Sequence, residues 1–352
     1  MAQVALAPPR TATSSSHWYT ARPPSNAARA ARTSGVLERG VSDGGATVRA
    51  LYTRTVPLPA ADVEEVKAAR SAWARVDRSA RGLLRVVGGE RLEWLQGMVS
   101  NDVVALPVGG ACEATVLSPK GAMVALVRVL RREAEVLLEL PASETERVLN
   151  HLNRLLISED AELSAAPELA VLGVVGPKAP PAPSAALGVL PGPLPSEFDF
   201  VVPRTELAAL DAALGPAPTL SAATLEVLRV EAGVPEWGLE LKESTIPLEA
   251  NLERAINYKK GCYVGQEVIA RGTFRGQMNK RLVGVRLGAA ETPAGTELFR
   301  GDKKVGALTS VVRAASGGEV LALAYVHRDA LAPGTELLAG GQPAVVAALP
   351  FP

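Results

Sequence analysis

The segment from Lys280 to the end of the chain is the feature that most restricts the fold. It holds short apolar runs separated by glycine-containing turns: Arg281–Leu287, Glu297–Arg300, Lys303–Val312, Glu319–Val326 and Ala344–Leu349. Runs of this length with two-residue alternation are typical of antiparallel strands. Five or more such strands in one short segment predict a small antiparallel β-barrel.

Upstream of the barrel, short strands alternate with short helices. Leu83–Val87 reads as a strand and Glu90–Val99 as a helix with apolar residues on one face. Ser221 is placed to cap a helix that ends near Val230. This alternation predicts an α+β fold. Because 352 residues are too many for one ordinary hydrophobic core, we expect several domains.

We expect four parts along the chain. They are a disordered or poorly ordered N-terminal arm at 1–60, a discontinuous core domain at 69–130 plus 221–279, an α+β middle domain at 131–220, and the barrel at 280–352. Residues 1–37 contain arginine but no acidic residue, a composition shared with organelle transit peptides. Alanine, proline and arginine are abundant throughout, so we expect a cytoplasmic protein, and organelle targeting stays open.

The charge balance and the cysteine count limit the classes of function. Lys plus Arg and Asp plus Glu both total 37, which argues against broad nucleic-acid binding. No apolar run reaches the roughly 18 residues of a membrane span, so no membrane partner is expected. Cys112 and Cys262 lie far apart without a Cys-x-x-Cys pair. A closed zinc or iron–sulfur site within the chain is therefore not expected.

One stretch combines groups that suit chemistry. Cys262 follows Lys259 and Lys260, and neighbouring cations lower the pKa of a thiol. Gly261 and Gly265 on either side would allow positive φ or a close backbone approach. Gln266 and Arg271 add hydrogen-bond donors for an amide or a carboxylate. The alternative is that Cys262 is a small buried hydrophobic residue.

The amino-acid sequence of this stretch resembles the characteristic motif of the YgfZ family, the folate-binding relatives of the glycine-cleavage T-protein (aminomethyltransferase). The matching residues are Lys260, Gly261, Cys262, Tyr263, Gly265, Gln266 and Glu267. The resemblance implies a three-domain T-protein-like fold that ends in a small β-barrel. It also implies tetrahydrofolate, or a derivative, as the cofactor. Iron–sulfur enzymes or cluster carriers, and tRNA-modifying enzymes, are the implied partners.

The resemblance also implies residue roles. Arg229 to Gly233 matches the family's Arg-x-Glu-Ala-Gly, whose glutamate binds the pterin of folate, and this places Glu231 at the pterin. A carboxylate suits that role because it can accept two hydrogen bonds side by side. Asp102, Arg271 and Gln266 are the further candidate folate contacts. Cys262 is the functional thiol and a transient ligand for cluster iron.

The chain departs from the enzyme at two adjacent positions of the family pattern. Where the aminomethyltransferase has an acidic pair in an apolar strand, this sequence has Val124 and Ala125. An alkyl group can neither orient nor deprotonate a folate nitrogen, so a classical enzyme is not expected.

Three hypotheses follow. The first is a folate-binding accessory protein that uses Cys262 to support iron–sulfur cluster assembly or repair in enzymes, including those that thiolate tRNA. The second is a folate-dependent aminomethyltransferase or demethylase in which Glu249 or Glu267 replaces the missing base. The third is a non-catalytic interaction module with an empty pocket, in which Cys262 is buried and structural.

Overall fold

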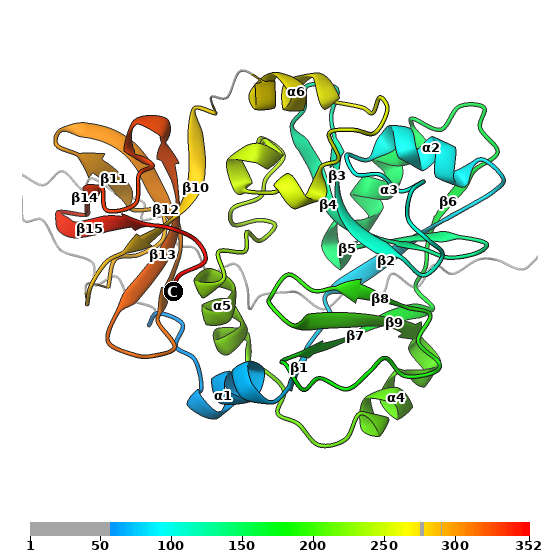
Figure 1. Cartoon of the computed structure of the whole chain (residues 1–352), viewed down its shortest axis with the longest axis horizontal. Coiled ribbons are helices and arrows are strands. Elements are labelled where there is room, and N and C mark those ends of the chain that lie inside the picture. The colour runs from blue at the N-terminus through cyan, green and yellow to red at the C-terminus, as the bar shows by residue number, and fades with distance from the viewer. Residues whose placement is uncertain (1–56, 275–277, 290) are drawn as a thin grey trace, which may run out of the picture. The chain divides into compact units, whose positions relative to one another are not determined.

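Two antiparallel sheets and a barrel make up the described part of the computed structural model, which comprises residues 57–274, 278–289 and 291–352 (Figure 1). The five-stranded sheet has the order β3-β4-β5-β2-β6. Its strands are β2 (Arg81–Val87), β3 (Ala111–Leu117), β4 (Met123–Arg131), β5 (Val136–Pro141) and β6 (Glu162–Ala165). The arm expected at 1–60 and the segment 1–37 lie almost entirely outside the described residues.

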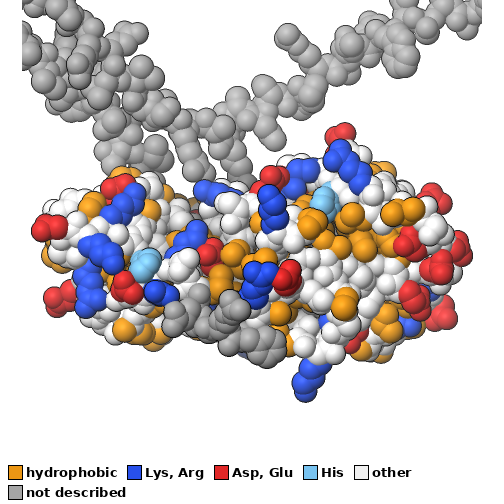
Figure 2. Space-filling view, turned by 90° about the horizontal axis from the view of Figure 1, so that it is seen from above, with side chains coloured by type: hydrophobic (Ala, Val, Ile, Leu, Met, Phe, Trp, Pro, Cys, Tyr) orange, Lys and Arg blue, Asp and Glu red, His pale blue; other side chains and the backbone are white. Residues whose placement is uncertain are grey.

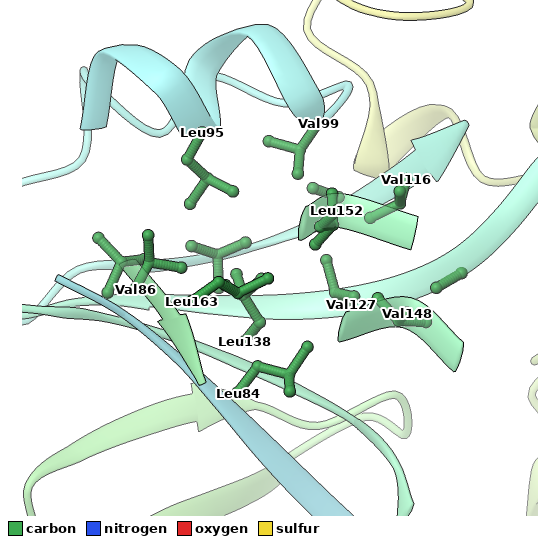
Figure 3. Close-up of a cluster of buried hydrophobic side chains, with 14 of the residues drawn as sticks. Leu84, Val86, Leu95, Val99, Val116, Val127, Leu138, Val148, Leu152 and Leu163 are labelled. Carbon is green, nitrogen blue, oxygen red and sulfur yellow. The ribbon is translucent and has the colours of Figure 1, made fainter. Parts of the chain in front are cut away.

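Helices α2 (Arg91–Met98) and α3 (Thr145–Asn153) cover one face of this sheet. In Figure 3, Leu95 and Val99 project from the α2 segment toward sheet residues such as Leu138. Val148 and Leu152 of α3 join the same fully buried cluster. Each fully buried aliphatic side chain contributes about 1.5–3 kcal/mol of transfer free energy, so this cluster is a main source of stability.

A second, four-stranded sheet packs against the opposite face. Its order is β1-β7-β9-β8, with β1 (Ala74–Val76), β7 (Leu169–Val175), β8 (Gly188–Pro191) and β9 (Glu197–Pro203). Leu83, Leu130 and Leu137 of the first sheet meet Val171 and Val201 of the second. Strand β4 is therefore buried on both faces, which explains its nearly continuous apolar sequence. Helix α4 (Leu207–Ala213) packs on the outer face of the second sheet.

Buried ion pairs join the two sheets. Arg128 of β4 contacts Glu139 of β5 (Nε–Oε2, 2.7 Å) and Asp199 of β9 (Nη2–Oδ2, 2.6 Å). Arg81 also pairs with Glu139, and Arg78 pairs with Asp199. Although burial opposes its ionisation, Arg81 and Arg128 hold the pKa of Glu139 well below its usual range. Glu139 is thus kept charged in the interior by its arginine partners.

The prediction of a C-terminal barrel is confirmed. The closed barrel has the order β10-β13-β12-β11-β14-β15, and every pair is antiparallel. Its strands are β10 (Lys280–Arg286), β11 (Glu297–Arg300), β12 (Lys303–Arg313), β13 (Val320–His327), β14 (Glu336–Ala339) and β15 (Gln342–Ala347). Strand β14 was not expected from the sequence, because Glu336–Ala339 is too short to show a clear alternation.

The strand pairings do not follow the expected division between the core domain and the middle domain. Strand β5 lies in the segment assigned to the middle domain, yet it pairs with β4 and β2 of the first sheet. Strand β1 lies in the segment assigned to the core domain, yet it pairs with β7. The pairing of strands distant in sequence decides sheet membership, and local patterning does not reveal it. The domain boundaries themselves stay a prediction.

The remaining helices connect these layers. They are α1 (Val63–Ser71), α5 (Ala222–Glu231), α6 (Gln266–Phe274) and the 3₁₀ helices η1 (Ala142–Glu144), η2 (Arg204–Glu206), η3 (Pro247–Ala250), η4 (Glu253–Ala255) and η5 (Arg328–Ala330). The predicted cap of α5 is confirmed, since the Ser221 side chain accepts a hydrogen bond from the Thr224 backbone N–H. Val227 and Val230 of α5 pack against barrel residues, among them Leu321.

Candidate functional site

The thiol of Cys262 is free and exposed, on the loop between η4 and α6. This exposure is compatible with a functional thiol, whereas the alternative of a small buried hydrophobic residue does not fit it. Cys112 differs, because it is partly buried on β3 and packs against the core of the first sheet. Burial raises the pKa of the Cys112 thiol to about 11, so this cysteine stays protonated at neutral pH.

Lys260 fixes the loop two residues before the thiol. Its ammonium donates to the backbone carbonyls of Gln96 (2.6 Å), Val99 (2.7 Å) and Asn101 (2.7 Å). These carbonyls lie at the C-terminal end of α2, where helical carbonyls lack partners and the helix dipole favours a cation. Burial lowers the pKa of Lys260 to about 8, which still leaves it mostly charged at neutral pH.

This contact bears on one expectation from the sequence, which stays a prediction. We expected Lys259 or Lys260 to stabilise the thiolate of Cys262. The ammonium of Lys260 is instead committed to the end of α2, so its main role here is to anchor the loop. The exposed Lys259 remains as the neighbouring cation.

The loop is also anchored after the thiol. The Val264 backbone N–H donates to the Gly97 carbonyl at 3.0 Å. Gly265 has φ +81°, and a Cβ built there would lie 2.5 Å from the Ser118 carbonyl oxygen. Gly265 therefore meets both requirements that favour glycine, a left-handed φ and close backbone approach. Gly261 meets neither, since its φ is ordinary and an added Cβ would have no neighbour within 4 Å.

We expect Gly265→Ala to lower the free energy of unfolding by about 2 kcal/mol or more, because the left-handed φ and the backbone clash both oppose a Cβ. The matched control is Gly261→Ala in the same loop, which should change stability by less than about 1 kcal/mol. Urea unfolding of the two variants and the wild type measures the difference. Equal stabilities for the two variants would contradict this account of the loop.

The other motif residues hold the start of α6. The side-chain oxygen of Gln266 accepts from the Tyr263 backbone N–H at 3.3 Å. The Tyr263 ring packs among the buried residues beneath the loop, and the Lys260 ammonium lies 5.2 Å from its centre. Glu267 and Arg271 form an exposed ion pair along α6. In this structure Gln266 and Arg271 thus bind their own chain, and their contacts with folate stay predictions.

Asp102 and Glu231 lie in different surroundings. Asp102 accepts from the side chain of Gln96 (2.9 Å), and its charge acts on Lys260, so it belongs with the loop. Glu231 ends α5 and accepts from Arg70 of α1 (2.6 Å) and from the Ala315 backbone N–H (2.8 Å). Glu231 thus ties α1 and α5 to the barrel. Its role at a pterin stays a prediction.

The alternative general bases differ in exposure. Glu249 in η3 is buried, with Lys280 at 3.6 Å. Burial raises the pKa of Glu249, and the Lys280 ammonium offsets part of that rise. Glu267 is exposed and paired with Arg271. Only Glu249 therefore has the environment of a perturbed carboxyl group.

A cavity of about 420 Å³ adjoins Val124 of β4. It is lined by Ser118, Met123, Val124, Arg147, Asn150, His151, Arg154 and Glu243. The motifs in the sequence do not point to the basic residues of this wall. Their spacing of four and seven positions is the signal that could have done so, because it places Arg147, His151 and the C-cap residue Arg154 on one side of α3.

The described residues contain no group of three or more His, Cys, Asp or Glu side chains placed to hold a metal ion. Among the helices of this part of the chain, none is long and apolar enough to cross a membrane. On the face seen in Figure 2, basic and acidic side chains are interspersed, as the zero net charge would suggest.

Two family models match the chain. The GCVT N-terminal domain matches residues 41–184, and the glycine cleavage T-protein C-terminal barrel domain matches residues 280–351. Together they cover more than half of the chain. The structure also resembles glycine cleavage system aminomethyltransferase T from Bartonella henselae, with a TM-score of 0.74 and 20% identity over 84% of this chain and 91% of that one. The predicted T-protein-like fold is thus confirmed.

Two of the curated relatives are named for iron–sulfur cluster assembly and for tRNA modification. The iron-sulfur cluster assembly factor IBA57 homolog, mitochondrial, of Mycosarcoma maydis is 28% identical over 242 residues, 63% of this chain and 59% of its own length. The tRNA-modifying protein YgfZ of Yersinia enterocolitica is 26% identical over 232 residues, 60% of this chain and 70% of its own length. The match to the first therefore spans less than two thirds of that relative.

Proposed function

This chain belongs to the glycine cleavage T-protein family, and on that premise we propose that it is a folate-binding accessory protein of iron–sulfur cluster assembly or repair. Its clients in this proposal are iron–sulfur enzymes, including those that thiolate tRNA. The relatives named for cluster assembly and for tRNA modification support this assignment. We propose a cytoplasmic location for the activity.

The observation that carries the proposal is an exposed thiol on an anchored loop. Cys262 is free and exposed, while Lys260 and Val264 on either side are hydrogen-bonded to the α2 segment. A cysteine that served only packing would be buried, so the third hypothesis, a structural Cys262, loses its main support. Anchoring reduces the conformational freedom that a partner would otherwise have to remove on binding.

One thiolate cannot hold a cluster alone, so the remaining ligands come from a client, a carrier or a small thiol. In this proposal Cys262 ligates one iron transiently while the client supplies the other ligands. The thiol is exposed on the loop, so a cluster whose other ligands belong to a client could reach it.

Tetrahydrofolate, or a derivative, is the proposed cofactor. Glu231 would accept from the pterin with the lone pairs that Arg70 and Ala315 leave available. Asp102, Gln266 and Arg271 are the further proposed contacts. Val124 and Ala125 are buried on β4 and supply no proton-transfer group, which favours binding of folate over turnover.

Titration with tetrahydrofolate tests this cofactor. We expect the wild type to bind with micromolar affinity, and Glu231→Ala to weaken binding by about tenfold or more, because a charge-assisted contact is lost. Arg70→Met is the matched control, since it breaks the same ion pair but keeps the carboxylate. Cys262→Ala should bind as the wild type does. A wild type that does not bind would overturn the folate assignment.

The buried Glu249 favours one second candidate, a folate-dependent aminomethyltransferase or demethylase. Burial raises the pKa of Glu249, and a raised carboxyl pKa is the direction that suits a general base. Turnover of an aminomethyl or N-methyl substrate with tetrahydrofolate, lost in Glu249→Gln, would identify this activity.

A further inference from the structure

The cavity beside Val124 has a basic wall that the proposed function does not use. Arg147 and His151 of α3 line it together with Arg154, which caps that helix, and Glu243 is the only carboxylate among its lining residues. Val124 of β4 also lines the cavity and contributes no charge to it. Arg147 pairs with Glu144 and Glu243, whereas Arg154 is the lining arginine that has no ion pair among the described residues.

Arg147 is held in place before any ligand arrives. Its guanidinium donates to Glu144 (Nε–Oε2, 2.8 Å) and to the Val124 carbonyl (Nη2–O, 2.6 Å). It also lies 5.4 Å from the centre of the Trp237 ring. These contacts fix the plane of the guanidinium, and a fixed plane is what recognition of an oxyanion by two parallel hydrogen bonds needs.

Arg154 and His151 have unused hydrogen-bonding capacity. The Arg154 guanidinium makes no hydrogen bond or ion pair within the described part of the chain. The His151 Nε2 atom is buried and, among the described residues, has no hydrogen-bond partner. A buried polar atom without a partner is unfavourable by about 1–3 kcal/mol, so a ligand that satisfies it gains affinity.

We propose that this cavity binds a small molecule through a carboxylate or phosphate group, with Arg147 and Arg154 as the cationic partners and His151 as a further donor. A volume of about 420 Å³ suits a ligand of metabolite size. Ser118 lines the cavity, and its carbonyl also limits the space at Gly265. The ligand would thus lie across one turn from the Cys262 loop. This inference does not depend on folate binding.

The protonation of His151 should make the affinity for an anion depend on pH. Burial, together with the charges of Arg147 and Arg154, lowers the pKa of His151, so the ring is neutral at neutral pH in the empty site. A bound anion offsets the arginine charges and favours the protonated ring. Protons are then taken up with the ligand, and affinity should rise as pH falls. Glu243 is the other charged group lining the cavity, and its carboxylate opposes the anion.

Calorimetric titration of the full chain with inorganic phosphate and, separately, with glutarate tests the site at constant ionic strength. We expect at least one anion to bind, and the tighter of the two identifies the ligand class. Arg154→Met should weaken binding by about ten- to a hundredfold, because a charge-assisted contact is lost. Arg300→Met in the barrel is the control and should leave the affinity unchanged.

Two further variants separate ligand contact from a structural role. Glu243→Gln should tighten binding by about two- to fivefold, because its carboxylate pairs with Arg147 at 3.2 Å but is largely exposed. His151→Gln should remove the rise in affinity between about pH 7.5 and pH 5.5. Absence of binding to both anions, or equal binding by wild type and Arg154→Met, would overturn the proposal.

Discussion

Replacing Arg128 by methionine should lower the free energy of unfolding by about 3–5 kcal/mol, the largest stability effect we expect from one side chain. Arg128 is buried between Glu139 and Asp199, and both carboxylates are fully buried. Methionine fills much of the same volume but leaves these charges with fewer partners. The effect therefore comes from unpaired buried charge, since little packing is lost.

The pH dependence of this variant gives a second readout. In the wild type Glu139 has a depressed pKa, so its contribution to stability is present above the unfolded carboxyl pKa and declines as pH falls below it. In Arg128→Met the folded pKa of Glu139 rises toward or above the unfolded value. The variant should therefore lose less stability than the wild type on acidification from about pH 5 to pH 3.

Chemical unfolding of Arg128→Met measures this effect, and Arg313→Met is the control. Arg313 pairs with Glu291 on the surface of the barrel, where an ion pair contributes about 0–1 kcal/mol. If Arg128→Met and Arg313→Met destabilise the protein equally, the buried ion pairs do not carry the stability that the structure assigns to them.

Cys262→Ser should abolish support of iron–sulfur enzymes in cells that lack the wild-type protein, while stability stays within about 0.5 kcal/mol of the wild type. The reason is that the thiol is exposed and has no packing role, whereas a hydroxyl is a poor ligand for cluster iron. The activity of a tRNA-thiolating enzyme, or of another iron–sulfur enzyme in the same cells, is the measurement.

Cys112→Ser is the matched control for this experiment. Its thiol is partly buried, and burial raises its pKa to about 11, so it should not serve as a ligand. We expect this variant to keep full activity with some loss of stability. Full support by Cys262→Ser would show that the loop does not act through its sulfur.

Local patterns in the sequence predicted a large part of the fold. The barrel strands alternate with a period of two between glycine turns, and Ser221 marks the start of α5 by a contact only three residues away. The motif around Cys262 is likewise contiguous in the sequence, so its resemblance to a known family could be recognised without a structure. The exposure of Cys262 was one of two alternatives that the residues left open.

The sequence by itself thus determined the strands of the barrel, the start of α5 at Ser221 and the motif that contains Cys262. Each of these features depends on neighbours within a few residues. Only the tertiary structure decided that Lys260 anchors the end of α2, that Glu231 contacts α1 and the barrel, and that β5 joins the first sheet. It also brought α3 and Val124 together around a basic cavity. The residues next to a charged side chain do not reveal which group it will contact, and these partners lie many residues away along the chain.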